Sequence, residues 1–375
     1  MRFYLDHAAG SPLRPAVADR VSAIALEPGN PSSLHSAGRA ARARLEDARE
    51  RLAAALDAHP TEIVFTSGGT EADNLAVLGA ARARESGRPR VAVSAIEHPA
   101  VAQAAASLGD RAVRVPVAPS GVAELAAWAA ALDATCALAS LMWVNNETGA
   151  VQPVSAVADL AHAVGAWAHS DAVAALGHVP VSFASSGLDL LSVSAHKVGG
   201  PVGIGALVVR RGLELAPLGF GGGQERLLRS GTVPVTLAVG LACAAEAAVA
   251  EPAAEASRLG GLRDRISAGL AGLPGVTLNS RPDGSPAMVN ATFEGCRADD
   301  LLLLLDAAGV DCSTGSACTA GVHQPSEVLL AMGRTRAQAS GSLRFSLGWS
   351  STDADADALL AALPDALARA HAANA

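Results

Sequence analysis

Seven short runs of β-forming residues alternate with alanine-rich helical stretches between residues 60 and 210, and this alternation constrains the fold most strongly. The expected strands are 62–66, 90–95, 111–117, 135–143, 166–171, 188–195 and 203–210. The helical stretches between them include 70–84, 99–107, 122–131 and 154–164. Strands that are apolar on both faces and separated by helices are typical of a mostly parallel sheet covered by helices. The sequence therefore predicts an α/β fold.

The texture of the sequence changes after about residue 250. Residues 34–56 form an amphipathic segment that leads into the alternating region. Beyond residue 250 come a helix, a strand near 275–279, the runs MVNATFE, LLLLLDAAG and SLRFSLG, and a final alanine-rich helix. We therefore expect a large domain over 12–250 and a smaller α/β domain made of 1–11 and 251–375.

Composition excludes several classes of protein. The net charge of −8 and the scattered arginines argue against nucleic-acid binding. The N-terminus MRFYLDHAAG has no apolar core, and no apolar run reaches 18 residues, so we expect neither a signal peptide nor a membrane span. The five cysteines are odd in number and show no CxxC or Cys/His metal spacing. This pattern favours a reduced cytoplasm over a disulfide framework or a zinc site.

The segment SAHKVGGPVGIG contains Lys197, which is the only lysine in the chain; the other 27 basic side chains are arginines. Arginine replaces lysine at little cost where only charge matters. It fails where a nucleophilic amine is needed, because a guanidinium does not deprotonate or form a Schiff base. A last surface lysine left by drift is the plainer explanation, and the neighbouring motifs argue against it.

Four polar segments follow strands of the expected sheet: TSGGTEADN, AIEHPA with His98, HSDAV with Asp171, and SAHK with Lys197. In parallel sheets, binding sites gather at these carboxyl ends. Taken singly, the glycine turn is as well explained by an ordinary strand–helix turn, Asp171 by a helix cap and His98 by a polar cap. Together they supply an anion cradle, a carboxylate, an aromatic ring and one reactive amine. These are the parts of a pyridoxal phosphate site.

These segments, with further ones along nearly the whole chain, resemble those of a known family. The further segments are YLDHAAGSP, GNPSSLH, VNNETGAVQPV, GGGQERLLRSGTVPV and TGSACTAGVHQPS. They resemble the cysteine desulfurases, homodimeric pyridoxal phosphate enzymes of the aminotransferase class V group, and their housekeeping branch in particular. The resemblance implies the fold-type I architecture and a reaction that converts L-cysteine to L-alanine. The sulfur then passes to an acceptor protein, either an iron–sulfur scaffold or a thiolation enzyme.

The resemblance also assigns roles around the cofactor ring. Lys197 is the lysine that would form the Schiff base and later move the Cα proton. His98 would stack on the ring, and Asp171 would pair with the pyridine nitrogen. Asn146 would hydrogen-bond the cofactor or the substrate.

At the two ends of the cofactor the resemblance implies a phosphate site and a substrate clamp. The phosphate would be held by Gly69, Thr70, Ser194 and His196. Thr232 would reach the phosphate of the partner subunit. Arg344 would bind the substrate carboxylate with its planar fork.

The sulfur-handling residue would be Cys318, in the Ser/Gly/Ala-rich stretch TGSACTAG. A thiol in such a loop can approach a substrate sulfur. The other four cysteines lie in apolar, helical or turn surroundings, where a small buried hydrophobe is the better interpretation. They are Cys136, Cys243, Cys296 and Cys312.

The chain departs from the family pattern at two places. Ala174 stands where the family usually has a glutamine that bonds the cofactor's phenolic oxygen, and Gly10 and Ser11 replace a pair of threonines. The first departure keeps other reactions on the same fold open: a selenocysteine lyase, another C–S lyase or an epimerase. A catalytically inactive sulfur-transfer partner is the remaining alternative, and the presence of Lys197, Asp171 and Cys318 argues against it.

Overall fold

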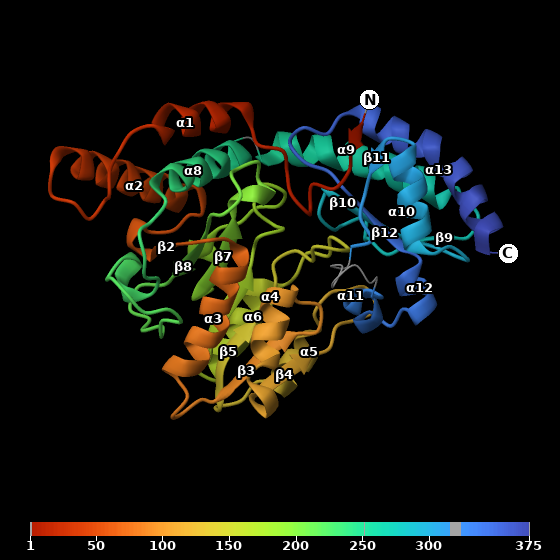
Figure 1. The fold of residues 1–375 in the computed structure, drawn as a ribbon. Coiled ribbons are helices and arrows are strands. Elements are labelled where there is room, and N and C mark those ends of the chain that lie inside the picture. Colours follow the sequence, from red (N-terminus) through yellow and green to blue (C-terminus); the bar gives the residue numbers. More distant parts are fainter. Residues whose placement is uncertain (1, 251, 316–323, 375) are drawn as a thin grey trace.

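The computed structural model describes residues 2–250, 252–315 and 324–374, and it confirms the α/β architecture (Figure 1). A seven-stranded sheet lies at its centre, in the order β2-β8-β7-β6-β5-β3-β4. All seven expected strands are present. Their bounds are β2 (Ile63–Thr66), β3 (Arg90–Ser94), β4 (Ala112–Val115), β5 (Cys136–Ser140), β6 (Trp167–Asp171), β7 (Leu190–Ser194) and β8 (Gly205–Val209).

The sheet is mostly parallel, as the sequence predicts, with β8 as the exception. Strands β4, β3, β5, β6 and β7 pair in parallel, whereas β8 runs antiparallel to both β7 and β2. A parallel neighbour needs a crossover of a dozen or more residues. The ten residues between β7 and β8 are too few for one.

Helices cover both faces of the sheet. One face packs in a single apolar cluster with side chains of α2, α6 and α8, and the other packs with α3 and α4. Alternate residues of one strand point to opposite faces: Ile63 and Phe65 belong to the first cluster and Val64 to the second. The helices of this part are α1 (Pro15–Ala25), α2 (Ser36–Ala55), α3 (Gly69–Ala83), α4 (Pro99–Ala106), α5 (Leu125–Ala131), α6 (Val154–Ala163), α7 (Phe183–Ser186) and α8 (Val235–Val249).

The C-terminal part has its own apolar cluster around a small antiparallel sheet in the order β12-β10-β9. The first strand of the chain pairs in parallel with β11, so the N-terminus lies beside the C-terminal helices (Figure 1). Leu5 is fully buried in this cluster. The elements are β1 (Phe3–Tyr4), α9 (Pro252–Ala271), β9 (Val276–Leu278), β10 (Met288–Phe293), α10 (Ala298–Ala307), β11 (Val310–Asp311), α11 (Glu327–Ala331), α12 (Arg336–Ser340), β12 (Ser342–Ser346) and α13 (Asp353–Asn374).

A fourth apolar cluster joins the two parts. Ile96 and Met142, from loops at the edge of the large sheet, pack against Leu329 and Met332 near α11. Ala339 of α12 completes this cluster. The contact fixes the C-terminal part over the carboxyl ends of the parallel strands.

Within the described ranges, no single helix is long and apolar enough to span a membrane. Helices α8 and α9 pass that test only when they are taken together as a bent pair. Ala238, Leu241 and Ala245 of α8 are buried in the core of the large sheet.

Candidate active site

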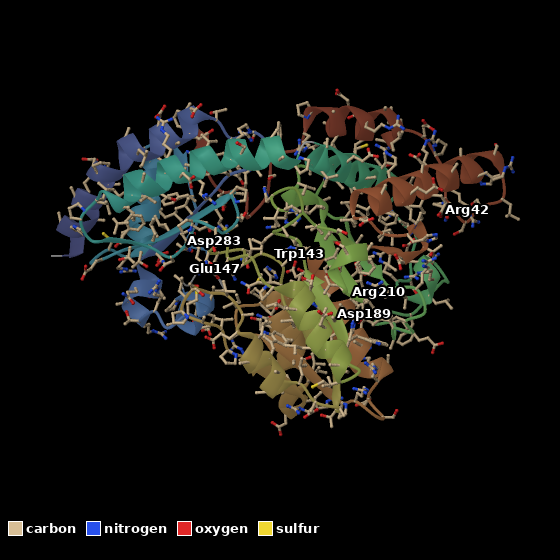
Figure 2. The ribbon with its side chains drawn as sticks, turned by 180° about the vertical axis from the view of Figure 1, so that it is seen from behind. Arg42, Trp143, Glu147, Asp189, Arg210 and Asp283 are labelled. Carbon is tan, nitrogen blue, oxygen red and sulfur yellow. The ribbon has the colours of Figure 1, made fainter. Side chains whose placement is uncertain are left out.

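A cavity of about 520 Å³ lies where the C-terminal part faces the carboxyl ends of the parallel strands. It is lined by eight of the site residues that the sequence predicts: Gly69, Thr70, His98, Asn146, Asp171, His196, Lys197 and Arg344. Glu147 also lines it, and Figure 2 shows this residue near the junction of the two parts. The topology thus brings together residues that lie up to 275 positions apart.

Lys197 ends a 3-10 turn, η3 (Ala195–Lys197), directly after β7. Its Nζ atom donates hydrogen bonds to the backbone oxygens of Ala8 and, at 3.0 Å, of Ala9. Burial and then the nearby charge of Arg344 lower the pKa of this amine to about 8, against the opposing effects of Asp6 and Asp171. A partly neutral amine at physiological pH is the form in which lysine acts as nucleophile and base.

The shifted pKa of Lys197 gives a first expectation. Because the chain has one lysine, protein labelled with ¹³C-lysine should give a single lysine Cε signal. In the apoprotein this signal should titrate with a midpoint near 8, so that the neutral amine accumulates as the pH rises from 7 to 9. Asp6→Asn should lower the midpoint, because the Asp6 charge favours the ammonium form. A midpoint at the ordinary lysine value of about 10.4 would contradict this account.

Asp171 ends β6 and is buried, with 5% of its surface exposed. Its Oδ1 accepts a hydrogen bond from the backbone N–H of Val173 at 2.8 Å. Burial raises the pKa of this carboxyl, although His98 and Lys197 act in the opposite direction. A buried carboxylate needs a cationic partner, and a protonated pyridine nitrogen would supply one.

Two further acids near Asp171, Asp73 and Glu97, were not predicted from the sequence. Asp73 of α3 lines the cavity, and polar side-chain atoms of Asp73, His98 and Asp171 lie within 4.8 Å of one another. Burial and then the charge of Asp171 raise the pKa of both Asp73 and Glu97 well above the ordinary range. One oxygen of each acid has no hydrogen-bond partner among the described residues. Asp73 follows Thr70 by three positions, and this helical spacing was the signal that could have revealed it.

His98 caps α4, where its Nδ1 accepts the N–H of Ala100 at 3.1 Å. Burial lowers the pKa of the ring, and Lys197 lowers it further, while Asp171 acts in the opposite direction. The lowered pKa favours the neutral form of the ring. The cap explains part of its geometry, but the ring also lines the cavity, where a flat neutral imidazole can stack on a ligand.

The first turn of α3 also lines the cavity. Gly68 provides no side-chain cap for this helix, so its first N–H groups have no capping side chain, and Thr70 lies in the same turn. A Cβ atom on Gly69 would lie 2.8 Å from Cγ2 of Val173, so only glycine allows this packing. At the end of β7, Ser194 Oγ and His196 Nδ1 are 2.8 Å apart. A helix start with adjacent hydroxyl and imidazole groups is a typical phosphate site.

Arg344 of β12 is 4% exposed and belongs to the C-terminal part. Its two terminal nitrogens donate to the backbone oxygen of Asn146 at 2.9 Å and to Oδ1 of Asp6 at 2.7 Å. Its Nε is buried and has no partner among the described residues. Arg344 lines the cavity, where a planar guanidinium is suited to a carboxylate.

The N-terminal arm closes the cavity over Lys197. Ser11 keeps a hydroxyl at its position, which donates to the backbone oxygen of Lys197 at 3.0 Å and lies 3.0 Å from Nδ1 of His7. His7, whose pKa burial lowers to about 4, also lines the cavity. Ala174 lines the cavity too, and its methyl group offers no hydrogen bond there.

Of the predicted site residues that the structure describes, Ser194 and Thr232 are outside the lining of this cavity. Thr232 does not line this cavity; it lines a second one, of about 380 Å³, with Arg49, Glu225 and Arg226. Cys318 lies outside the described residues. Of the other cysteines, Cys136 and Cys296 are buried as expected, whereas Cys243 and Cys312 are only partly buried.

Comparisons with known proteins agree with this site. The aminotransferase class-V family profile matches residues 3–359. An IscS-like cysteine desulfurase of Mycobacterium tuberculosis is 48% identical, over 98% of this chain and 97% of that protein. The cysteine desulfurase IscS of Methanosarcina thermophila is 40% identical, over 96% of this chain and 91% of that protein.

Solved structures give the same result. A NifS-like protein superimposes with a TM-score of 0.92 at 34% identity, covering 98% of this chain and all of that one. DndA from Streptomyces lividans gives 0.77 at 41% identity, covering 92% and 99%. The chain therefore belongs to the aminotransferase class-V family of enzymes. Its relatives within that family are cysteine desulfurases, which use pyridoxal phosphate. They do not favour the selenocysteine lyase, C–S lyase or epimerase alternatives.

Proposed function

We propose that the chain is a pyridoxal-phosphate-dependent cysteine desulfurase that converts L-cysteine to L-alanine and transfers the sulfur to Cys318. The observation that carries this proposal is Lys197. Lys197 is the only lysine of the chain, its pKa is lowered, and it lines the cavity together with the buried carboxyl of Asp171 and with Arg344. Pyridoxal phosphate, when bound, links to such an amine and withdraws electrons from the Cα atom of an amino acid.

The residues of the cavity fit this cofactor. The first turn of α3, with Gly69 and Thr70, would bind the phosphate, and Ser194 and His196 would bind it from the other side. Asp171 would hold the pyridine nitrogen in its protonated form. His98 would pack on the ring. These roles are supported by the helix start without a side-chain cap, by the buried carboxyl of Asp171 and by the lowered pKa of His98.

The substrate would be held at the other end of the cavity. Arg344 would bind its carboxylate through the guanidinium group, and Asn146 would orient it. Neutral Lys197 would take the Cα proton. The thiolate of Cys318 would attack the substrate sulfur and form an S–S bond. The C–S bond would break with its electron pair left on Cβ, which takes up a proton, and Lys197 would return a proton to Cα, so that the product leaves as L-alanine.

The assembly and setting belong to the same proposal. We infer a homodimer in which Thr232 of the partner subunit completes the phosphate site. This would explain why Thr232 lies outside the cavity of its own chain. The large domain would span 12–250, and the small domain would comprise 1–11 and 251–375. A cytoplasmic enzyme that passes its persulfide sulfur to a scaffold or thiolation enzyme fits the free thiols among the described cysteines.

The sulfur-carrying role of Cys318 is tested with a serine variant. Cys318→Ser should still bind the cofactor and L-cysteine but should lose persulfide formation and alanine turnover, because serine lacks an easily ionised sulfur. Cys312→Ser is the matched control. Burial raises the pKa of the Cys312 thiol to about 12, so it is a poor nucleophile and its loss should leave turnover close to native. Mass spectrometry of the persulfide and an alanine assay give the readout. Native-like turnover by Cys318→Ser would reassign the sulfur chemistry.

A further inference from the structure

Residues 225–227, labelled η4 (Glu225–Leu227), form a strained turn at the surface. Three consecutive residues with side chains have positive φ angles: 44° at Glu225, 58° at Arg226 and 65° at Leu227. This left-handed region is unfavourable for any residue with a Cβ atom, and it is normally visited by single residues only. A run of three persists only where the surroundings determine it.

The surroundings of this turn are dominated by the Glu225 carboxylate, which is 7% exposed. Arg49 of α2 donates hydrogen bonds to both of its oxygens, at 2.7 Å and 3.0 Å. The backbone N–H of Phe65, in β2, donates to the same carboxylate at 2.7 Å. Arg49 also donates to the oxygen of Ile63 at 2.9 Å and lies over the Phe65 ring, 4.9 Å from its centre. Glu225 therefore ties the turn to α2 and to β2 at once.

The turn lies on the segment that leads to Thr232. The N–H of Gly231 donates to the side chain of Gln224 at 3.0 Å, which closes the loop between them. Glu225, Arg226 and Thr232 then line the same 380 Å³ cavity. Arg42 lines it as well, and in Figure 2 this residue lies at the outer side of the molecule, well apart from Glu147 of the first cavity. The cavity that the pair shapes is separate from the first one, although Nε of Arg229, in the same segment, donates to Oε1 of Glu71, which lines the first cavity, at 3.1 Å.

Two large apolar side chains, one in this segment and one just before it, are mostly exposed among the described residues. Leu227 is 68% exposed and Phe220 is 86% exposed. A strained backbone, a buried bidentate ion pair and exposed apolar side chains together describe a loop held ready for a contact in trans.

We propose that Glu225, with Arg49, is a positioning residue for the active site of a second copy of this chain: it holds the 224–232 segment in the shape that lets Thr232 complete the partner's phosphate site. This inference rests on the proposed sharing of Thr232 across a homodimer. It adds that the precision of the shared site is set by an ion pair in the chain that donates Thr232.

Heterodimers that contain a single active Lys197 separate the two chains. Two differently tagged chains are expressed together, and one of them carries Lys197→Ala. In the trans arrangement Glu225→Gln is placed in the Lys197→Ala chain, and in the cis arrangement it is placed in the chain that keeps Lys197. The dissociation constant of pyridoxal phosphate at the remaining site is measured by borohydride trapping at increasing cofactor concentration. We expect it to rise about tenfold in the trans arrangement and by a clearly smaller factor in the cis arrangement, where the segment contacts its own site through Arg229 and Glu71.

Matched variants make each outcome decisive. Glu246→Gln breaks another ion pair of α2, with Arg51, away from this loop, and it should have no effect in either arrangement. If Glu225→Gln prevents folding, Arg49→Lys keeps the charge but loses the two-pronged contact and should give the same trans effect. Equal effects in both arrangements, or a larger effect in cis, would overturn the inference.

Thr232→Ala placed in trans distinguishes the two proposals. If Thr232→Ala weakens cofactor binding in trans and the Glu225 and Arg49 variants do not, only the positioning role is wrong. If Thr232→Ala has no effect in trans, the sharing of the site is wrong and this inference is overturned with it. Neither result would count against the proposed desulfurase function.

Discussion

Lys197→Ala is expected to lower the turnover of L-cysteine by at least about 10⁴-fold, because the change removes both the nucleophilic amine and the base that moves the Cα proton. The fold should survive the change, since within the described part of the chain the Lys197 amine bonds just the backbone oxygens of Ala8 and Ala9. Alanine production gives the rate, and circular dichroism with thermal unfolding gives the fold. Borohydride reduction of the native holoenzyme should label one internal peptide, the one that contains Lys197.

Lys197→Arg is the matched variant for this expectation. Arginine keeps a positive charge and can still donate to the same backbone oxygens, but its guanidinium stays protonated and does not link to the cofactor. It should therefore lose as much activity as the alanine variant. Turnover within tenfold of native by either variant, or a reducible visible chromophore in Lys197→Ala, would remove Lys197 from the mechanism.

Arg344→Ala is expected to raise KM for L-cysteine about 100-fold with a smaller change in kcat. A charge-assisted hydrogen bond to the substrate carboxylate is worth about 1.5–3 kcal/mol, which corresponds to roughly 10- to 150-fold in affinity. The variant also leaves the Asp6 carboxylate without its 2.7 Å partner, which adds to the effect. Arg344→Lys should lie between the two, since lysine keeps the charge but loses the planar fork.

A substrate without a carboxylate charge separates binding from misfolding. L-Cysteine methyl ester should be bound equally by the native enzyme and by Arg344→Ala, because neither makes an ion pair with the ester. Arg334→Ala is the matched control: Arg334 bonds Asn279 at 2.9 Å in the same part of the chain, away from the cavity. If Arg344→Ala weakens the ester as much as L-cysteine, the residue supports the fold and not the substrate.

The large sheet was predictable because its signal is local. Most strands of the central sheet are short apolar runs buried on both faces, with the edge strand β4 as an exception, and a helix or turn follows each within a few residues. The antiparallel direction of β8 could also have been read from the length of its connection to β7. The pairing of β1 with β11 could not, because it joins two-residue strands 306 positions apart with no turn between them to fix the register.

The site was predictable in part, for a related reason. Lys197, Asp171, His98 and Thr70 follow strand ends, and the topology of a parallel sheet brings such positions together. The contact of Asp6 with Arg344 depends on how the N-terminal arm crosses between the two parts, which no local pattern specifies. Glu97 lies in the loop after β3, where it is buried and accepts a hydrogen bond from the backbone N–H of Met142. No local pattern in the sequence indicates this burial.

The central claim is that this chain takes sulfur from L-cysteine with its own thiol as acceptor. The most direct measurement is incubation of the holoenzyme with L-cysteine, with alanine, pyruvate and protein-bound persulfide all quantified in the first turnover. We expect one alanine for each persulfide, with the persulfide on the peptide that contains Cys318 and no pyruvate. Pyruvate with free sulfide, or alanine without any persulfide on the protein, would contradict it.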